Sequence, residues 1–195
     1  MTKLEEICMI KIELVNHHLK YAERMSQLSS DEEVKKALNL TDAQCSLKGT
    51  KSFIEHIRIQ EKIGTQYSKV ILNEKDELIG VITLKDIDAD RKIAHIGTWI
   101  GSEYWGKGYN ELAKEAILKH AFLILNLDYV FAGAAIHNIR SQKAQEKLPY
   151  MKLHVDDLFP AELKKIEHET QSKCILNVIE KEDFLKYFES KVSSF

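Results

Sequence analysis

The sequence is poor in residues that break or cross-link a chain. Only two prolines occur among 195 residues, and no Ser/Gly-rich stretch suggests a linker. The three cysteines, Cys8, Cys45 and Cys174, are odd in number and far apart, and no C-x-x-C pair exists. These absences argue against a zinc ribbon and against a disulfide framework. Unpaired cysteines are typical of a reducing compartment.

The sequence also lacks long apolar runs and an excess of charge of one sign. Its longest apolar stretch, residues 121–136, is interrupted by Asn126 and Asp128 and is too short to span a bilayer. The N-terminal residues lack the basic-then-apolar order of a signal peptide. With 28 basic and 30 acidic residues, the formal net charge is −2, so no basic surface for nucleic acid is expected. We therefore expect a cytoplasmic protein that binds neither membranes nor nucleic acid.

The order of sequence patterns predicts one α+β domain over residues 1–195, with a core at about 7–180 and a helical extension at 181–195. A three-strand meander followed by alternating helices and strands favours one mixed sheet over a doubly wound parallel sheet. Strands are expected at residues 7–15, 68–72, 78–84, 92–100, 129–136, 152–155 and 173–179. Helices are expected at residues 17–29, 31–38, 50–63, 109–125, 139–148, 160–169 and 183–191, and polar turns at 73–76 and 86–90.

Residues 95–110, HIGTWIGSEYWGKGYN, hold four of the eight glycines and both tryptophans. A strand-like run ends there in a glycine-rich turn, and a strong helix follows. Glycine lets a backbone approach a ligand closely, and the first N–H groups and positive dipole end of a helix favour an anion. The stretch therefore predicts a turn in which the amides of residues 105–110 hold a pyrophosphate and Lys107 adds positive charge.

Two common phosphate motifs do not fit this turn. A Walker loop needs Ser or Thr after its lysine, and here Gly108 follows Lys107. The dinucleotide fingerprint needs a third glycine where Glu111 stands, and it follows the first strand of a βαβ unit rather than a meander. Taken alone, the turn is equally explained as a plain connection between a strand and a helix.

A second motif follows the turn. Residues 138–150 read NIRSQKAQEKLPY, and the turn itself reads YWGKGYNELA, preceded by IGTWI. The turn resembles Q/R-x-x-G-x-G/A, the A motif of the GNAT superfamily of acetyl-CoA-dependent N-acetyltransferases. Both segments together resemble the branch that acetylates ribosomal proteins, whose second pattern runs from N-x-x-S to K-L-G-F. The resemblance covers about residues 7–180.

The resemblance implies a fold, a cosubstrate and a reaction. The mixed, mostly antiparallel sheet would be splayed between its fourth strand, residues 94–101, and its fifth, residues 130–136, with the pantetheine arm of acetyl-CoA between them. The small side chains of residues 133–135 suit such an approach, or else tight packing against the long helix.

The implied reaction is direct attack of a primary amine, from a protein N-terminus or a small molecule, on acetyl-CoA in a ternary complex. The oligomeric state is left open, with a homodimer as one arrangement. The implied cofactor-binding residues are Trp99, Ile100, Trp105, Gly106, Lys107, Gly108, Tyr109, Asn110, Asn138 and Ser141.

Three side chains are candidates for the chemistry. By resemblance Ser141 would protonate the departing thiolate, or it would only satisfy amides in the first turn of its helix, which Asn138 is expected to cap. His95 has the titration range of a general base, and a structural hydrogen bond on the sheet face is its alternative role. Glu103, beside the turn, is a second candidate base and stands where the superfamily has Gln or Arg.

Two departures from the branch pattern leave another function open. Gln145 stands where many members carry a tyrosine that protonates the leaving thiol, and Pro149-Tyr150 replaces Gly-Phe. A non-catalytic acyl-CoA-binding regulatory module is therefore the alternative to an enzyme.

No metal site is expected from the histidines. His17 and His18 are adjacent, so they would not share a helix face. His168 is followed by Glu169 and Thr170 without the second histidine of a zincin motif.

Overall fold

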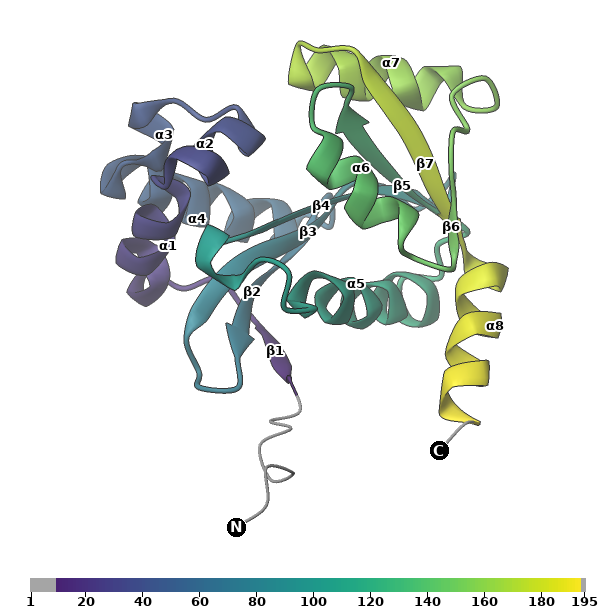
Figure 1. The fold of residues 1–195 in the computed structure, drawn as a ribbon, viewed down its shortest axis with the longest axis horizontal. Helices are drawn as coiled ribbons and strands as arrows, with labels where there is room; N and C mark the ends of the chain where they lie inside the picture. The colour runs from purple at the N-terminus through teal and green to yellow at the C-terminus, as the bar shows by residue number, and fades with distance from the viewer. Residues whose placement is uncertain (1–9, 194–195) are drawn as a thin grey trace.

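The computed structural model describes residues 10–193, and its centre is a seven-stranded sheet (Figure 1). The strands are β1 (Ile12–Val15), β2 (Tyr67–Asn73), β3 (Leu78–Asp88), β4 (Ile93–Ile100), β5 (Tyr129–Ala135), β6 (Met151–Lys152) and β7 (Cys174–Glu180). They lie in the order β1-β2-β3-β4-β5-β7-β6. Only β4 and β5 run parallel, and the other neighbouring pairs are antiparallel. The expected mixed, mostly antiparallel α+β fold is confirmed.

Strands β4 and β5 pair over a short stretch and then part. Residues 93–95 lie opposite residues 129–131, and the ladder between the two strands ends there. Each strand nevertheless continues with its other neighbour, β4 with β3 up to Ile100 and β5 with β7 up to Ala135. The separation expected between the fourth and fifth strands is therefore present, and it divides the sheet into two arms.

Helices cover both faces of the sheet (Figure 1). Their bounds are α1 (Ala22–Ser29), α2 (Glu32–Leu38), α3 (Asp42–Cys45), α4 (Leu47–Lys62), α5 (Tyr109–Lys119), α6 (Ile139–Glu146), α7 (Pro160–Thr170) and α8 (Lys181–Val192). Helices α5 and α8 pack on one face in a core that contains Ile117 and Phe184. Helices α1 and α4 pack against the first arm through a second cluster, which contains Met25 and Ile54. Helix α7 covers β5 and β7, where Ile166 joins a third cluster.

Side-chain caps explain where two of the early helices begin. Thr41 and Gln44 form a reciprocal capping box that starts α3, a short helix missing from the sequence prediction. Ser46 then accepts the amide of Gly49 and starts α4 at Leu47, ahead of the predicted start at residue 50.

Two of the predicted strands in the first arm have different bounds. The predicted first strand, residues 7–15, begins in the structure at Ile12, and its residues 7–9 lie outside the described residues. The predicted turn at 86–90 is too long, because β3 continues to Asp88. An irregularity between Lys85 and Asp88 lets the strand accommodate Asp86, whose φ is 53°.

The second arm also differs from the prediction at its elements' ends. The helix predicted at 109–125 is α5 followed by a π-helical turn, His120–Ile124. Strand β6 is confined to Met151–Lys152 rather than 152–155, because His154 has a φ of 56° and donates its amide to the side chain of Asn177.

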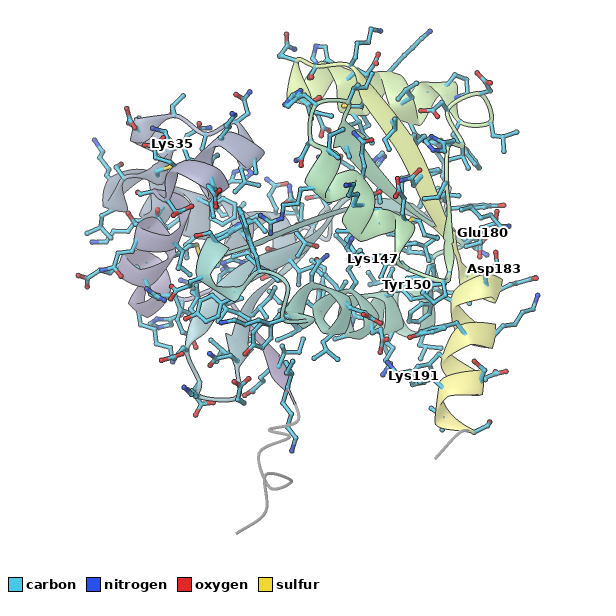
Figure 2. All side chains as sticks on the ribbon, viewed as in Figure 1. Lys35, Lys147, Tyr150, Glu180, Asp183 and Lys191 are labelled. Atoms are coloured by element: carbon cyan, nitrogen blue, oxygen red, sulfur yellow. The ribbon has the colours of Figure 1, made fainter. Side chains whose placement is uncertain are left out.

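The C-terminal helix packs its aromatic rings on Tyr150 and is joined to α5 by polar contacts with Glu115. Phe184 is fully buried, and the ring of Tyr150 lies 5.2 Å from it and 5.0 Å from the ring of Tyr187. Figure 2 shows Tyr150 beside α5 and Lys191 at the far end of α8, where Lys191 pairs with Glu115 of α5 at 2.6 Å. Tyr150, which replaces the phenylalanine of the pattern that the sequence resembles, thus packs its ring into the apolar core.

Two further observations hold for residues 10–193. None of their helices combines the length and the apolar composition that a membrane crossing requires. No cluster of three or more His, Cys, Asp or Glu side chains is placed to share a metal ion. Cys45 and Cys174 are buried free thiols, and Cys8 lies outside this range.

Candidate active site

The edge of β4 that faces β5 presents main-chain groups to the gap. The amide of Gly101 donates to a carbonyl of β3, so strand alternation turns the main-chain groups of Ile96, Thr98 and Ile100 the other way, toward β5. The carbonyl of Ile100 accepts a hydrogen bond from the indole of Trp105 at 2.6 Å. The hydroxyl of Thr98 is buried and has no hydrogen-bond partner among the described residues. Such an edge suits an extended ligand that carries amide groups of its own.

The glycine-rich turn has the backbone expected of an anion site. Gly106 has a φ of 75° and Gly108 a φ of 87°, so both occupy the left-handed region that favours glycine. Gly108 is the N-cap of α5 and provides no side-chain cap for the helix amides. Residues 106–108 are exposed, and a Cβ added at Gly106 would meet nothing within 4 Å. The positive end of α5, with the cationic Lys107 in the turn before it, fits a diphosphate, whereas the amide of Trp105, predicted to take part, donates to the carbonyl of Ser102.

Most other residues predicted to bind the cofactor use their side chains for packing. Trp99 packs against the α1–α4 cluster, and Ile100 is buried in the α5 core. Tyr109 is 5% exposed, and its hydroxyl donates to the carboxylate of Glu74 at 3.0 Å. Asn110 is half-buried in the first turn of α5. Ile100 and Tyr109 would therefore meet a cofactor through their main chain, whereas the main chain of Trp99 faces β3.

The start of α6 places Ser141 in a hydrogen-bonded network. Asn138 caps the helix by accepting the amide of Ser141 at 3.1 Å, which confirms the predicted cap. The buried amide of Gln145 donates to Oγ of Ser141 at 3.3 Å and to the carbonyl of Gly133 at 3.3 Å, and it accepts from Asn177 at 2.7 Å. Because Oγ of Ser141 is an acceptor in this contact, its own hydrogen can be donated elsewhere.

Arg140 connects the two arms and was not identified from the sequence. Its guanidinium group, on α6, lies over the indole ring of Trp105, which belongs to the glycine-rich turn. This contact brings the start of α6, with Asn138 and Ser141, to the same end of the gap as that turn. Arg140 lies between Asn138 and Ser141 of the N-x-x-S motif, and this position was the signal by which the sequence could have identified it.

His95 lies where β4 and β5 separate, on the face covered by α7. Its ring is 2% exposed, and Nε2 lies 2.8 Å from Oε2 of Glu162. Burial lowers the pKa of His95, although the hydrogen bond and charge of Glu162 act in the opposite direction. Gly97 and Trp99 share this strand face, and a Cβ at Gly97 would meet nothing within 4 Å. Open space therefore lies next to the imidazole along the strand.

The second candidate base is placed differently. Glu103 is exposed and forms an ion pair with Arg24 of α1 at 2.7 Å. Arg24 also donates to the hydroxyl of Tyr104. These contacts direct the Glu103 carboxylate toward α1 and leave His95 as the buried base candidate of β4.

The small residues of β5 have a cause that the sequence did not reveal. A Cβ at Gly133 would lie 2.6 Å from Cδ1 of Ile166 in α7. The close approach of α7 therefore leaves no room for a side chain at Gly133, and α7 rather than the long helix α5 is the packing partner there. The approach of the pantetheine arm to residues 133–135 stays a prediction.

Comparison with known proteins identifies the family. The family model described as an acetyltransferase (GNAT) domain matches residues 11–150. An uncharacterized N-acetyltransferase, p20, of Bacillus licheniformis is 28% identical over 150 residues, which cover 76% of this chain and 84% of that protein.

Two solved structures share the fold. The spermidine N-acetyltransferase of Vibrio cholerae, in complex with CoA and spermine, superposes with a TM-score of 0.67 at 14% identity, over 90% of this chain and 98% of that one. The Salmonella typhimurium acetyltransferase that modifies the N-terminal serine of ribosomal protein L7/L12 has a TM-score of 0.66 at 17% identity, over 73% and 81% of the two chains. The family model spans most of the chain, and the parted strands and the glycine-rich turn lie where the two motifs predicted them, so the chain belongs to the GNAT family of acetyltransferases.

Proposed function

We propose that the protein transfers the acetyl group of acetyl-CoA to a primary amine, by direct attack of the amine in a ternary complex. One observation carries the proposal: the ladder between β4 and β5 ends after residues 95 and 131 while both strands continue. The main-chain N–H and C=O groups on the β5 side of β4 beyond residue 95 therefore face a gap between the strands, and the glycine-rich turn follows the end of β4.

The residues at this gap fit the parts of coenzyme A. The amides around Gly106 and Gly108 would hold the diphosphate, with Lys107 and Arg140 as the nearby cations. The main-chain groups of Ile96 and Thr98 would pair with the amides of the pantetheine arm. Asn138, beside Ser141, would face the same arm from α6.

Acetyl-CoA supplies the activated thioester, and the protein holds the reactants and moves protons. Alignment of amine and thioester supplies much of the acceleration, roughly 7–11 kcal/mol in well-oriented systems. An N–H group of residues 96–100 would stabilise the developing oxyanion. Ser141 would donate its hydroxyl hydrogen to the departing thiolate, and His95 would accept the proton that the amine loses.

The acceptor class is proposed from two relatives. One is a spermidine N-acetyltransferase, and another modifies the N-terminal serine of a ribosomal protein. We therefore propose a peptide N-terminus or a small amine as the acceptor, for an enzyme that acts in the cytoplasm, with a homodimer as an arrangement to be tested by sedimentation.

Thiol release tests this function directly. Purified protein is incubated with acetyl-CoA and a panel of acceptors, which includes peptides with free N-termini, polyamines, aminoglycosides and amino acids, while free CoA is measured. We expect release that depends on both acetyl-CoA and one acceptor class, and mass spectrometry should show the acetylated amine. Absence of release with every acceptor would count against the proposal.

A non-catalytic acyl-CoA-binding module is the second candidate, because Gln145 replaces the tyrosine that many relatives use as an acid. Ser141→Ala distinguishes the two functions. An enzyme should lose most of its turnover and keep its affinity for acetyl-CoA, which calorimetry measures. A binding module should show tight binding in both forms and turnover in neither.

A further inference from the structure

His95 and Glu162 form a buried pair that connects β4 to α7. Glu162 is 3% exposed, and its two carboxylate oxygens have different partners. Oε2 lies 2.8 Å from Nε2 of His95, and Oε1 accepts a hydrogen bond from Arg91 at 2.6 Å. The sequence analysis expected a helix at residues 160–169 but gave Glu162 no role.

The charge of Glu162 determines where the hydrogen of the imidazole lies. Burial acts to raise the pKa of Glu162, but the hydrogen bonds and charges of His95 and Arg91 outweigh it and hold that pKa below its ordinary value. A carboxylate only accepts hydrogen bonds, so Nε2 of His95 must be the donor. The pKa of His95 is itself lowered, chiefly by burial, so the ring is neutral near pH 7 and Nδ1 carries the lone pair.

That lone pair has no hydrogen-bond partner in the described part of the chain. Nδ1 is buried and lies within hydrogen-bonding distance of no group among residues 10–193. A buried polar atom without a partner costs roughly 1–3 kcal/mol, so a water molecule that pairs with this nitrogen would be stabilised. Two residues further along the same strand face, Gly97 borders open space. A water molecule there would join Nδ1 to an amine bound at Gly97.

We propose that Glu162 is the positioning residue of the acetyl transfer, which holds His95 in the tautomer whose Nδ1 accepts the proton of the acceptor amine. The inference rests on the proposed function. In the step, the amine nitrogen forms the C–N bond and loses a proton to Nδ1 through water. The C–S bond breaks with its electron pair on sulfur, which takes a proton from Ser141, and the Ser141 oxygen regains a proton from solvent water. His95 then returns its proton to solvent.

The other charges around the pair provide a control. Lys85 and Lys165 both act to lower the pKa of His95. Lys85 pairs with Glu169 of α7, and Lys165 pairs with Asp86 of β3 at 3.2 Å. These ion pairs connect α7 to the sheet, and neither includes the imidazole of His95. Like Glu162→Gln, removal of Lys85 breaks a contact between α7 and the sheet. Unlike Glu162→Gln, it removes a positive rather than a negative charge from near His95.

The experiment compares Glu162→Gln with Lys85→Gln in pH profiles of kcat/KM, with one acceptor throughout. In Glu162→Gln the pKa of His95 should fall, so the rising limb moves to lower pH, and the plateau should drop by about 10-fold or more. KM for acetyl-CoA should not change. In Lys85→Gln the limb should move slightly to higher pH with the plateau preserved. If both variants keep the wild-type profile, or both only unfold more easily, Glu162 is a structural clamp and the proposal is wrong.

A second measurement does not depend on activity or on the stability of a variant. Nitrogen-15 NMR of the wild-type imidazoles reports which ring nitrogen carries hydrogen. We expect His95 to be protonated at Nε2 at pH 7, and a proton on Nδ1 would overturn the proposal. A wild-type protein that acetylates no amine would instead overturn the proposed function, so the two failures are distinguishable.

Discussion

The side-chain amide of Gln145 donates a hydrogen bond to Oγ of Ser141 from one helical turn further along α6. The same amide accepts from Asn177, which is fully buried. Many family members have a tyrosine at this position. Gln145 instead provides an amide that holds the hydroxyl of Ser141 in place by a hydrogen bond. The departure from the family pattern is compatible with proton donation by Ser141 rather than opposed to it.

Gln145→Leu tests this relationship. The variant leaves the amide of Asn177 buried without its partner, so we expect a loss of roughly 1–3 kcal/mol in the free energy of unfolding. Turnover should fall severalfold, because the hydroxyl of Ser141 is no longer held. Urea denaturation and steady-state kinetics measure the two effects. Gln142→Leu is the control, since within residues 10–193 the side chain of Gln142 bonds only the carbonyls of residues 135 and 136. Equal losses of turnover in both variants would mean that Ser141 needs no support from Gln145.

The glycine-rich turn is tested with two glycines of matching conformation. Gly106 and Gly64 have φ values of 75° and 77°, and a Cβ at either position would meet nothing within 4 Å. An alanine in this conformation costs about 1–2 kcal/mol, so Gly106→Ala and Gly64→Ala should lose similar stability. Only Gly106→Ala should weaken the binding of acetyl-CoA, by about tenfold in Kd, as measured by calorimetry. Similar affinities for both variants would remove the turn from the cofactor site.

Much of the architecture was predictable because its signals are local. The meander, the long helix and the parted strands follow from runs of residues and from two motifs. Helix α3 had a local signal that was overlooked, since Thr41 and Gln44 match the capping-box pattern. The orientation of Glu162 was also available in part, because Glu162 and Ile166 are four residues apart and share the buried face of α7.

Other features depend on contacts between distant segments and were not predictable from one sequence. Gly133 is required by Ile166, which lies in a helix packed across the sheet. Arg140 meets Trp105 only because the two arms converge at the glycine-rich turn. Glu103 is directed toward Arg24 by the position of α1. In each case the residue type was visible, but its partner was set by the packing of the arms.

The open space beside Gly97 is expected to receive the acceptor. Gly97→Ala and Gly97→Val place side chains of increasing size there, and nothing lies within 4 Å of the added Cβ. The folded state should be preserved, since valine favours strands. KM for the acceptor should rise with the size of the new side chain, severalfold for valine, while Kd for acetyl-CoA stays constant. An acceptor KM that is the same in all three proteins would place the acceptor elsewhere.

Acid should destabilise the fold through His17. Its ring is 4% exposed, Nε2 bonds Oγ of Ser68 at 2.9 Å, and Nδ1 is buried without a partner among residues 10–193. Burial lowers the pKa of His17 from 6.5 to about 4, against the opposing charge of Glu61 and with the help of Lys69. Between these two pH values the unfolded chain binds more protons than the folded one, so stability decreases as the pH falls. The loss attributable to His17 is about 3 kcal/mol once pH 4 is reached.

His17→Gln isolates this contribution, because glutamine can keep a hydrogen bond to Ser68 and does not titrate. Urea midpoints measured from pH 7 to pH 4 should decline less steeply in His17→Gln than in the wild type. Some slope should remain, since burial also lowers the pKa values of His95 and His120. His56→Gln, at an exposed position of α4, should leave the wild-type slope unchanged. If His17→Gln also follows the wild-type curve, protonation of His17 is not what weakens the fold in acid.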